Sequence, residues 1–207
     1  MGRWSDRALP HIVDKACGTG DIMKRRVTAC EGLQGRVLEI GFGSGHNVPF
    51  YPAAVTEVAA VEPADVAWRM SEQRREASDV PVERSGLDGE CLMEQDGSCD
   101  SALSTFTLCT IPDAVQALRE VRRVLKPGGS LHFLEHGQAP SEGVQSWQRR
   151  LEPVQRRLFG GCHLTRHMPS LLTEAGFEVV ELTEEYLPGP AFARPFTYGY
   201  VGRAVPA

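Results

Sequence analysis

Long apolar runs and closely spaced cysteines are missing from the sequence. Nowhere in its 207 residues do 18 apolar residues follow one another, and the start, MGRWSDRALP, has no apolar stretch of the length that a secretory signal needs. The six cysteines form no Cys-x-x-Cys pair and no tight cluster, so neither a zinc ribbon nor a disulfide framework is expected. We therefore expect a cytoplasmic protein with reduced thiols and without a transmembrane segment.

An excess of basic residues is also missing. Lys and Arg number 22 against 27 Asp and Glu, which gives a formal net charge of −5. Proteins that bind the phosphate backbone depend on clustered Lys and Arg, so nucleic acid is not an expected partner. With 42% hydrophobic and 24% charged residues the composition is globular, and the length fits one domain with a core of its own.

Short apolar runs alternate with helical patterns from residue 36 onward, which is typical of a parallel α/β sheet. The expected strands are 37–40, 55–61, 80–84, 101–108, 130–135, 178–183 and 198–205. The expected helices are 10–16, 21–30, 65–78, 114–125, 144–159 and 168–175. Pro153 is expected to kink the long helix 144–159.

The most informative stretch is the first expected strand with the turn behind it, Val37-Leu38-Glu39-Ile40-Gly41-Phe42-Gly43-Ser44-Gly45-His46-Asn47. Glycine lets a ligand approach the backbone where a Cβ atom would collide. A dinucleotide fingerprint would need Gly or Ala where His46 stands, and no G-x-x-x-x-G-K-[ST] phosphate loop is present. The turn therefore favours a ligand without a pyrophosphate, while a tight strand-to-helix connection is the alternative explanation of its glycines.

Two acidic residues follow the next expected strands. Glu62 comes directly after the second strand, where a carboxylate can accept hydrogen bonds from both ribose hydroxyls of an adenosine. Asp88 follows the third strand and can accept a hydrogen bond from an adenine amino group. With the glycine turn, these two residues favour an adenosine-containing ligand.

The motifs are most specific as a set. Glu39-x-Gly41-x-Gly43-x-Gly45, Glu62, Asp88 and Arg123-Val124-Leu125-Lys126-Pro127-Gly128-Gly129 together resemble the class I S-adenosylmethionine-dependent methyltransferases over residues 36–135. Segments 107–110, 133–136, 159–166 and 198–200 are similar to the methyltransferase type 11 branch that includes the alkyl thiol methyltransferases. The mammalian members of that branch carry a hydrophobic membrane anchor, which this sequence lacks.

This resemblance implies a Rossmann-like fold, with a mostly parallel seven-stranded sheet, helices on both faces and an N-terminal helical extension. It divides a single domain, 1–207, into a helical cap or lid (1–35), a cofactor-binding core (36–135) and substrate-side helices with the last strands (136–207). The implied cofactor is S-adenosylmethionine, with its methionine end on the turn 41–45, its ribose on Glu62 and its adenine on Asp88. The cofactor-binding residues that follow are Glu39, Gly41, Gly43, Gly45, Asn47, Glu62, Pro63, Leu87, Asp88 and Thr105.

Methyl transfer from a sulfonium is an in-line displacement whose leaving group is already activated, so a protein mainly aligns and desolvates the reactants. The branch resemblance favours a small-molecule acceptor with a thiol sulfur, whose thiolate a base or a positive environment must favour. His136 and Asp113 fall at the carboxyl edge of the expected sheet and are the expected catalytic residues. For His136, a hydrogen-bonded structural role is the alternative.

Other interpretations stay open from the sequence. The acceptor could be a quinone, a phenol, a lipid or an amine. The chain could also be an NAD(P)-dependent oxidoreductase or a cofactor-binding module without activity. No metal is expected, because Cys162, His163 and His167 lack an obvious fourth ligand.

Overall fold

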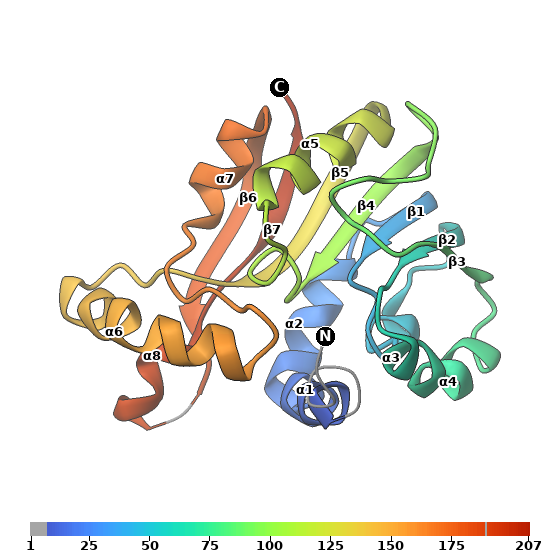
Figure 1. Ribbon diagram of the computed structural model, residues 1–207. Coiled ribbons are helices and arrows are strands. Elements are labelled where there is room, and N and C mark those ends of the chain that lie inside the picture. The colour runs from blue at the N-terminus through green and yellow to red at the C-terminus, as the bar shows by residue number, and fades with distance from the viewer. Residues whose placement is uncertain (1–7, 189) are drawn as a thin grey trace.

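Seven strands of the computed structural model form one sheet, within the residues that the structure describes, 8–188 and 190–207. The strands are β1 (Gly35–Ile40), β2 (Val55–Val61), β3 (Val82–Gly86), β4 (Cys99–Thr105), β5 (Leu125–His136), β6 (Phe177–Tyr186) and β7 (Tyr198–Pro206). Their order across the sheet is β3-β2-β1-β4-β5-β7-β6 (Figure 1). Strands β1 to β5 pair in parallel, and β7 runs antiparallel to both β5 and β6. The expected mostly parallel seven-stranded sheet is confirmed.

Helices cover both faces of this sheet. They are α1 (Leu9–Cys17), α2 (Gly20–Cys30), α3 (Asp65–Met70), α4 (Glu72–Glu76), α5 (Ala114–Val124), α6 (Glu142–Leu158), α7 (Met168–Glu174) and α8 (Arg194–Thr197), with the 3-10 turns η2 (Val48–Phe50) and η3 (Ala191–Ala193). In β1, Val37 packs in a cluster with α2, and Leu38 packs in the cluster that contains α5 and α7. Side chains alternate across a strand, so neighbouring residues of β1 serve opposite layers. Among the described helices, none has the length and apolar character needed to cross a membrane.

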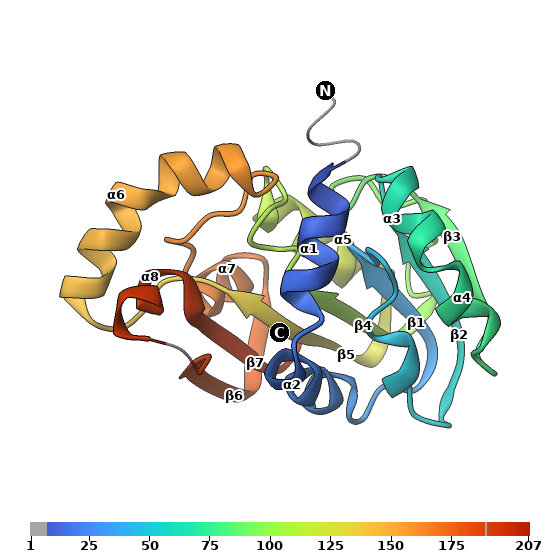
Figure 2. The same ribbon diagram turned by 90° about the horizontal axis from the view of Figure 1, so that it is seen from below.

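The strand order reverses between β1 and β4. In open α/β sheets, ligands bind at the carboxyl ends of the strands where such a reversal occurs. The glycine turn follows β1 and the segment 106–113 follows β4, so both lie at this edge. Helix α1 lies across the same edge, between α6 on one side and α3 on the other (Figure 2).

The observed elements overlap the expected ones, but several limits differ. Strand β5 begins at Leu125 rather than at 130, and β6 continues to Tyr186 beyond the expected 183. Strand β2 matches residue for residue, whereas β4 ends at Thr105 because the chain turns at Phe106, which has a φ of 54°. The expected helix 65–78 is divided into α3 and α4 at Ser71, whose hydroxyl donates to the Trp68 carbonyl at 2.7 Å. Pro153 lies inside α6, and the helix continues for one more turn beyond it.

The closest approach between strands in the C-terminal hairpin requires a glycine. The register of β6 against β7 shifts between Val179 and Glu181, and a Cβ atom on Gly202 of β7 would lie 2.1 Å from the Glu181 carbonyl oxygen. We expect Gly202→Ala to lower the free energy of unfolding by about 2 kcal/mol, because the strands must separate to admit the methyl group. Chemical denaturation measures this loss. Gly20→Ala is the matched control, since a Cβ there meets no described atom within 4 Å, and an equal loss in both variants would contradict this explanation.

Candidate active site

Two cavities adjoin at the carboxyl edge of the sheet. The first has a volume of about 590 Å³ and lies over the ends of β1, β2 and β4. The second has a volume of about 500 Å³ and lies between α1, α2, α6 and the ends of β5 and β7. The residues that line both are Val13, Cys17, Phe106, Thr110 and Phe159. Molecules bound in the two cavities would therefore meet at this shared wall.

The glycine turn and Glu62 form the floor of the first cavity. Glu62 accepts hydrogen bonds from the backbone N–H groups of Gly43 and Ala64, each at 2.7 Å. Burial raises the pKa of the Glu62 carboxyl, and these bonds oppose that shift. Each carboxylate oxygen keeps capacity for one further donor. Gly43 has a φ of 59°, and a Cβ there would approach no described atom closer than 3.9 Å, so the backbone is open to the cavity at this point.

A buried polar network lies behind this floor. Asn47 donates to Glu39 at 2.8 Å and to the Thr105 hydroxyl at 3.0 Å, and Tyr51 donates to Glu39 at 2.5 Å. Burial raises the pKa of Glu39 to about 7. Arg26 completes the network, because its Nη1 donates to the Asn47 Oδ1 at 2.7 Å and to the Thr105 hydroxyl at 2.9 Å.

Arg26 is a site residue that the sequence analysis missed. Its side chain lines the first cavity and is only 4% exposed, yet its Nε has no hydrogen-bond partner among the described residues. A buried guanidinium with a free N–H requires an acceptor, and the cavity is where one can be supplied. One signal in the sequence was available. Arg26 follows the buried Ile22 by four residues on α2, so the two side chains lie on the same face of the helix.

Asp88 and its neighbour lie at the rim of the first cavity. Asp88 is exposed and accepts a hydrogen bond from the Glu90 N–H at 2.9 Å, which closes a short turn. Leu87 is 58% exposed and also lines the cavity, as does Pro63. The rim therefore presents an exposed carboxylate next to an exposed apolar side chain.

The expected cofactor residues divide into two groups. Those that line the first cavity are Gly41, Gly43, Glu62, Pro63, Leu87, Asp88 and Thr105. Those that lie outside its lining are Glu39, Gly45 and Asn47. Glu39 and Asn47 belong to the buried network behind the floor, and their roles toward the cofactor stay predictions.

Helix α1 is attached to the glycine turn through Asp14. Asp14 accepts a hydrogen bond from the Ser44 hydroxyl at 2.6 Å, and its carbonyl oxygen lies 3.0 Å from His46 Nε2. Arg74 of α4 lies 3.5 Å from the same carboxylate. Burial opposes ionisation of Asp14, but the hydrogen bond from Ser44 and the charges of His46 and Arg74 outweigh it and lower its pKa. These contacts hold α1 over both cavities.

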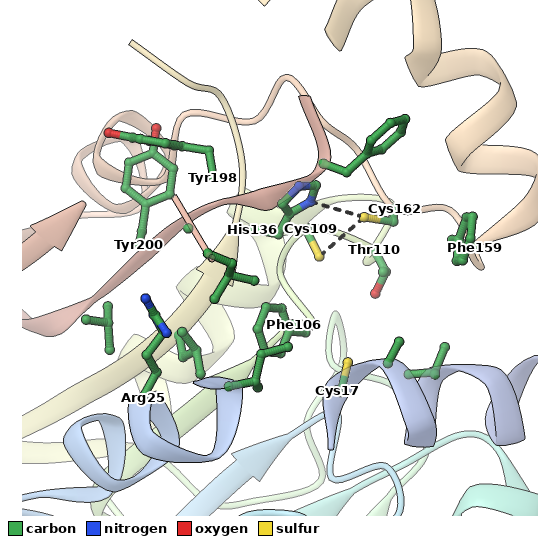
Figure 3. A pocket seen from close by; sticks show the side chains of 18 of the residues that line it. Cys17, Arg25, Phe106, Cys109, Thr110, His136, Phe159, Cys162, Tyr198 and Tyr200 are labelled. Atoms are coloured by element: carbon green, nitrogen blue, oxygen red, sulfur yellow. Dashed lines mark hydrogen bonds between the residues drawn. The ribbon is translucent and has the colours of Figure 1, made fainter. Parts of the chain in front are cut away.

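The second cavity is mainly apolar, with a cluster of soft donor atoms at one wall. Cys162 Sγ lies 3.8 Å from Cys109 Sγ and 3.5 Å from His136 Nδ1, and all three side chains are buried. Figure 3 shows them pointing toward one another, with Cys17 and Phe106 across the cavity. The hydrogen bonds of Cys162 with Cys109 and His136 lower the pKa of the Cys162 thiol, although burial opposes the shift.

Asp113, the other expected catalytic residue, lies outside the lining of both cavities. Its side chain accepts a hydrogen bond from the Gln116 N–H at 2.9 Å and caps the N-terminus of α5. Asp113 follows the carboxyl end of β4, but its carboxylate is occupied by the N-terminal backbone of α5. The side chains of His163 and His167 have partners other than Cys162. His163 pairs with Glu152 at 2.9 Å, and His167 caps α7.

Comparison with known proteins identifies the family. The methyltransferase domain family matches residues 38–133. Thiol S-methyltransferase TMT1B of Rattus norvegicus is 36% identical over 174 residues, which cover 82% of this chain and 70% of the relative. The chain belongs to the S-adenosylmethionine-dependent methyltransferases. The NAD(P)-dependent oxidoreductase and the inactive binding module are thereby excluded.

Further similarities agree with this assignment. Thiol S-methyltransferase TMT1A of Homo sapiens is 34% identical over 171 residues, which cover 79% of this methyltransferase and 69% of the relative. A solved structure of an S-adenosylmethionine-dependent methyltransferase from Thermotoga maritima superposes with a TM-score of 0.69 at 20% identity and covers 99% of both chains. That likeness confirms the Rossmann-like fold.

S-adenosylmethionine fits the first cavity of this methyltransferase. The free N–H of Arg26 can meet a carboxylate, which the methionine end carries. The oxygens of Glu62 can each accept one more hydroxyl, and the cavity holds no phosphate-binding lysine, which the cofactor does not need. When bound, the cofactor supplies an activated methyl group on a sulfonium.

The attachment of α1 is testable without substrate. We expect Asp14→Ala to raise the hydrogen-exchange rates of α1 amides about tenfold, because α1 loses its hydrogen bond to Ser44 and its ion pair with Arg74. Hydrogen–deuterium exchange with mass spectrometry measures this change. Asp21→Ala on α2 removes only an exposed ion pair with Lys24 and should leave α1 exchange unchanged. Unchanged α1 exchange in Asp14→Ala would show that other contacts hold the helix.

Proposed function

We propose that this methyltransferase transfers the methyl group of S-adenosylmethionine to the sulfur of a small apolar thiol. The observation that carries the proposal is the contact between two cavities of different character, one with the glycine turn and Glu62 and one with mainly apolar walls, at Phe106 and Thr110. The names of the relatives support sulfur as the acceptor atom, since both curated relatives above are thiol S-methyltransferases.

In this proposal three residues of the first cavity each bind a different part of the cofactor. Arg26 binds the methionine carboxylate, Glu62 accepts the ribose hydroxyls, and Asp88 accepts from the adenine amino group. Thr105 and the network of Glu39 and Asn47 fix the guanidinium of Arg26 in place. The cofactor sulfonium then lies toward the wall that both cavities share.

The second cavity holds the acceptor. Apolar walls from α2, β5 and β7 favour alkyl or aryl substituents and exclude water, which strengthens a thiolate nucleophile. The acceptor sulfur gives its proton to His136, from which it passes to solvent, and forms a bond to the methyl carbon. The carbon–sulfonium bond breaks, and its electron pair stays on the sulfur of S-adenosylhomocysteine. We assign His136 as the catalytic residue, because it lines this cavity beside two cysteines and has a buried Nε2 without a partner in the described parts of the chain.

The proposed location is the cytoplasm. All six cysteines, which lie in the described residues, are unpaired, including Cys109 and Cys162 with their sulfurs 3.8 Å apart. A reducing compartment keeps such neighbouring thiols from forming a disulfide.

Binding measurements separate the two ends of the cofactor. Arg26→Met should weaken S-adenosylhomocysteine binding about thirtyfold, because a charged hydrogen bond to the carboxylate is worth about 2 kcal/mol. Binding of methylthioadenosine, which lacks the amino-acid end, should change little in Arg26→Met but fall about thirtyfold in Glu62→Ala. Isothermal titration calorimetry gives each affinity. Equal losses for the two ligands in Arg26→Met would contradict the assignment of the carboxylate to Arg26.

An acceptor panel tests the second cavity. We expect methylation of alkyl and aryl thiols in preference to matched phenols, quinols and amines. His136→Ala should reduce turnover with a thiol about a hundredfold, whereas His132→Ala, on the same strand but outside both cavities, should not slow turnover once its folded fraction is accounted for. Labelled-methyl transfer measures both effects. Turnover of a phenol or an amine without any turnover of thiols would contradict the proposed acceptor.

A further inference from the structure

Three soft donor atoms converge at the wall of the acceptor cavity, from three separate parts of the chain. Cys109 follows β4, His136 ends β5, and Cys162 lies between α6 and α7. Their ligand atoms all lie within 4.8 Å of one another, and all three residues line the second cavity (Figure 3). The fold thus brings together a Cys₂His cluster that no local motif in the sequence predicts.

Two of the distances within the cluster fit a tetrahedral ion, and the ligand atoms of the third pair, Cys109 and His136, lie within 4.8 Å of each other. Around zinc, sulfur ligands at about 2.3 Å and a nitrogen ligand at about 2.0 Å are separated by about 3.8 Å (sulfur to sulfur) and about 3.5 Å (sulfur to nitrogen). The observed separations are 3.8 Å for Cys162 and Cys109, and 3.5 Å for Cys162 and His136 Nδ1. The side chains would need little movement to share one ion.

The cluster is also held in place by the surrounding backbone. The Glu135 carboxylate accepts from the Cys109 N–H at 3.2 Å, and the Cys109 carbonyl accepts from the His163 N–H at 2.8 Å. Arg166 donates to the Leu108 carbonyl, which fixes the segment after Cys162 against the loop that carries Cys109. Such a fixed outer shell is what metal ligands require to keep their geometry.

His136 turns its Nδ1 toward the two sulfurs of the cluster, and its side chain also lines the second cavity. His136 is 8% exposed, and its Nε2 is buried without a hydrogen-bond partner within residues 8–188 and 190–207. Three ligands with one open side toward a cavity are the pattern of a catalytic rather than a structural zinc site.

We propose that Cys109, His136 and Cys162 bind a zinc-class divalent ion whose fourth ligand is the acceptor thiolate. The role of the fourth ligand rests on the proposed function; the three-ligand site does not. On binding, the acceptor thiol releases its proton to solvent and its sulfur bonds the ion. The sulfur then forms a bond to the methyl carbon, the carbon–sulfonium bond breaks, and its electron pair stays on S-adenosylhomocysteine. The thioether product is a weaker ligand and leaves the ion.

Cobalt(II) substitution tests the site in the full-length, reduced and chelator-treated protein. We expect one cobalt ion per chain, with thiolate-to-cobalt charge-transfer absorption and the visible bands of a tetrahedral site. Zinc should displace the cobalt. Cys109→Ser and Cys162→Ser should each weaken binding at least about a hundredfold, whereas Cys91→Ser, which removes an exposed cysteine, should not change it. Retained S-adenosylhomocysteine binding shows that each variant is folded.

The outcomes separate this inference from the proposed function. A change of the cobalt bands on addition of an alkyl thiol would support the fourth ligand. Absence of the thiolate–cobalt bands, or bands that persist unchanged in both Cys109→Ser and Cys162→Ser, would overturn the site. Full thiol methylation by chelated protein would overturn the metal's role and leave the proposed function standing. Failure to methylate thiols with or without zinc would refute the proposed function, while the cobalt titration would still decide whether the ion binds.

Discussion

The buried carboxylate of Glu135 is the interaction on which the geometry of both cavities depends. It accepts a hydrogen bond from the Ser104 hydroxyl at 2.7 Å and from the backbone N–H groups of Thr107, Leu108 and Cys109 at 3.0 to 3.2 Å. Burial raises the pKa of this carboxyl, and the four donors oppose the shift. Without the carboxylate, these N–H groups would lie in the interior without an acceptor. The loop they belong to forms the boundary between the cavities, so one side chain at the end of β5 shapes both.

The N-terminal helices α1 and α2 complete the walls of the two cavities at the carboxyl edge of the sheet. Helix α2 packs against β5 and β7 and places Arg26 in the lining of the first cavity, while α1 lines both cavities and is held to the glycine turn by Asp14. Without these helices, the crevice between β1 and β4, where the strand order reverses, would be open to solvent. With these two helices the crevice forms two cavities that share a wall, and the polar groups of the glycine turn, Glu62 and Arg26 line the first of them. In the proposed function this arrangement keeps water away from the acceptor sulfur, and a displacement at a sulfonium needs that more than it needs an acid or a base.

The sequence was sufficient for the sheet and for seven of the residues that line the first cavity, because both depend on local patterns. Strand β2 was predicted residue for residue, and Gly43 and Glu62 could be placed from the turn and the strand end alone. A catalytic role for Asp113 stays a prediction; the cap that its carboxylate forms on α5 could also be expected, since the next helix begins at the carboxyl edge of β4. Arg26 and the Cys109–His136–Cys162 cluster were not predictable, because their partners are distant in sequence and only the tertiary fold brings them together. The lid role of residues 1–35 stays a prediction, and residues 1–7 lie outside the described structure.

A crystal structure of the full chain with S-adenosylhomocysteine and an alkyl methyl thioether, the proposed products, tests the central claim most directly. Our account predicts that the homocysteine carboxylate contacts Arg26 and that the homocysteine sulfur faces the wall formed by Phe106 and Thr110. The thioether sulfur should lie across that wall, beside Cys109, His136 and Cys162. A nucleoside bound in the first cavity with the thioether outside the second, or with the homocysteine sulfur turned away from the shared wall, would contradict the division of the site into a cofactor cavity and an acceptor cavity.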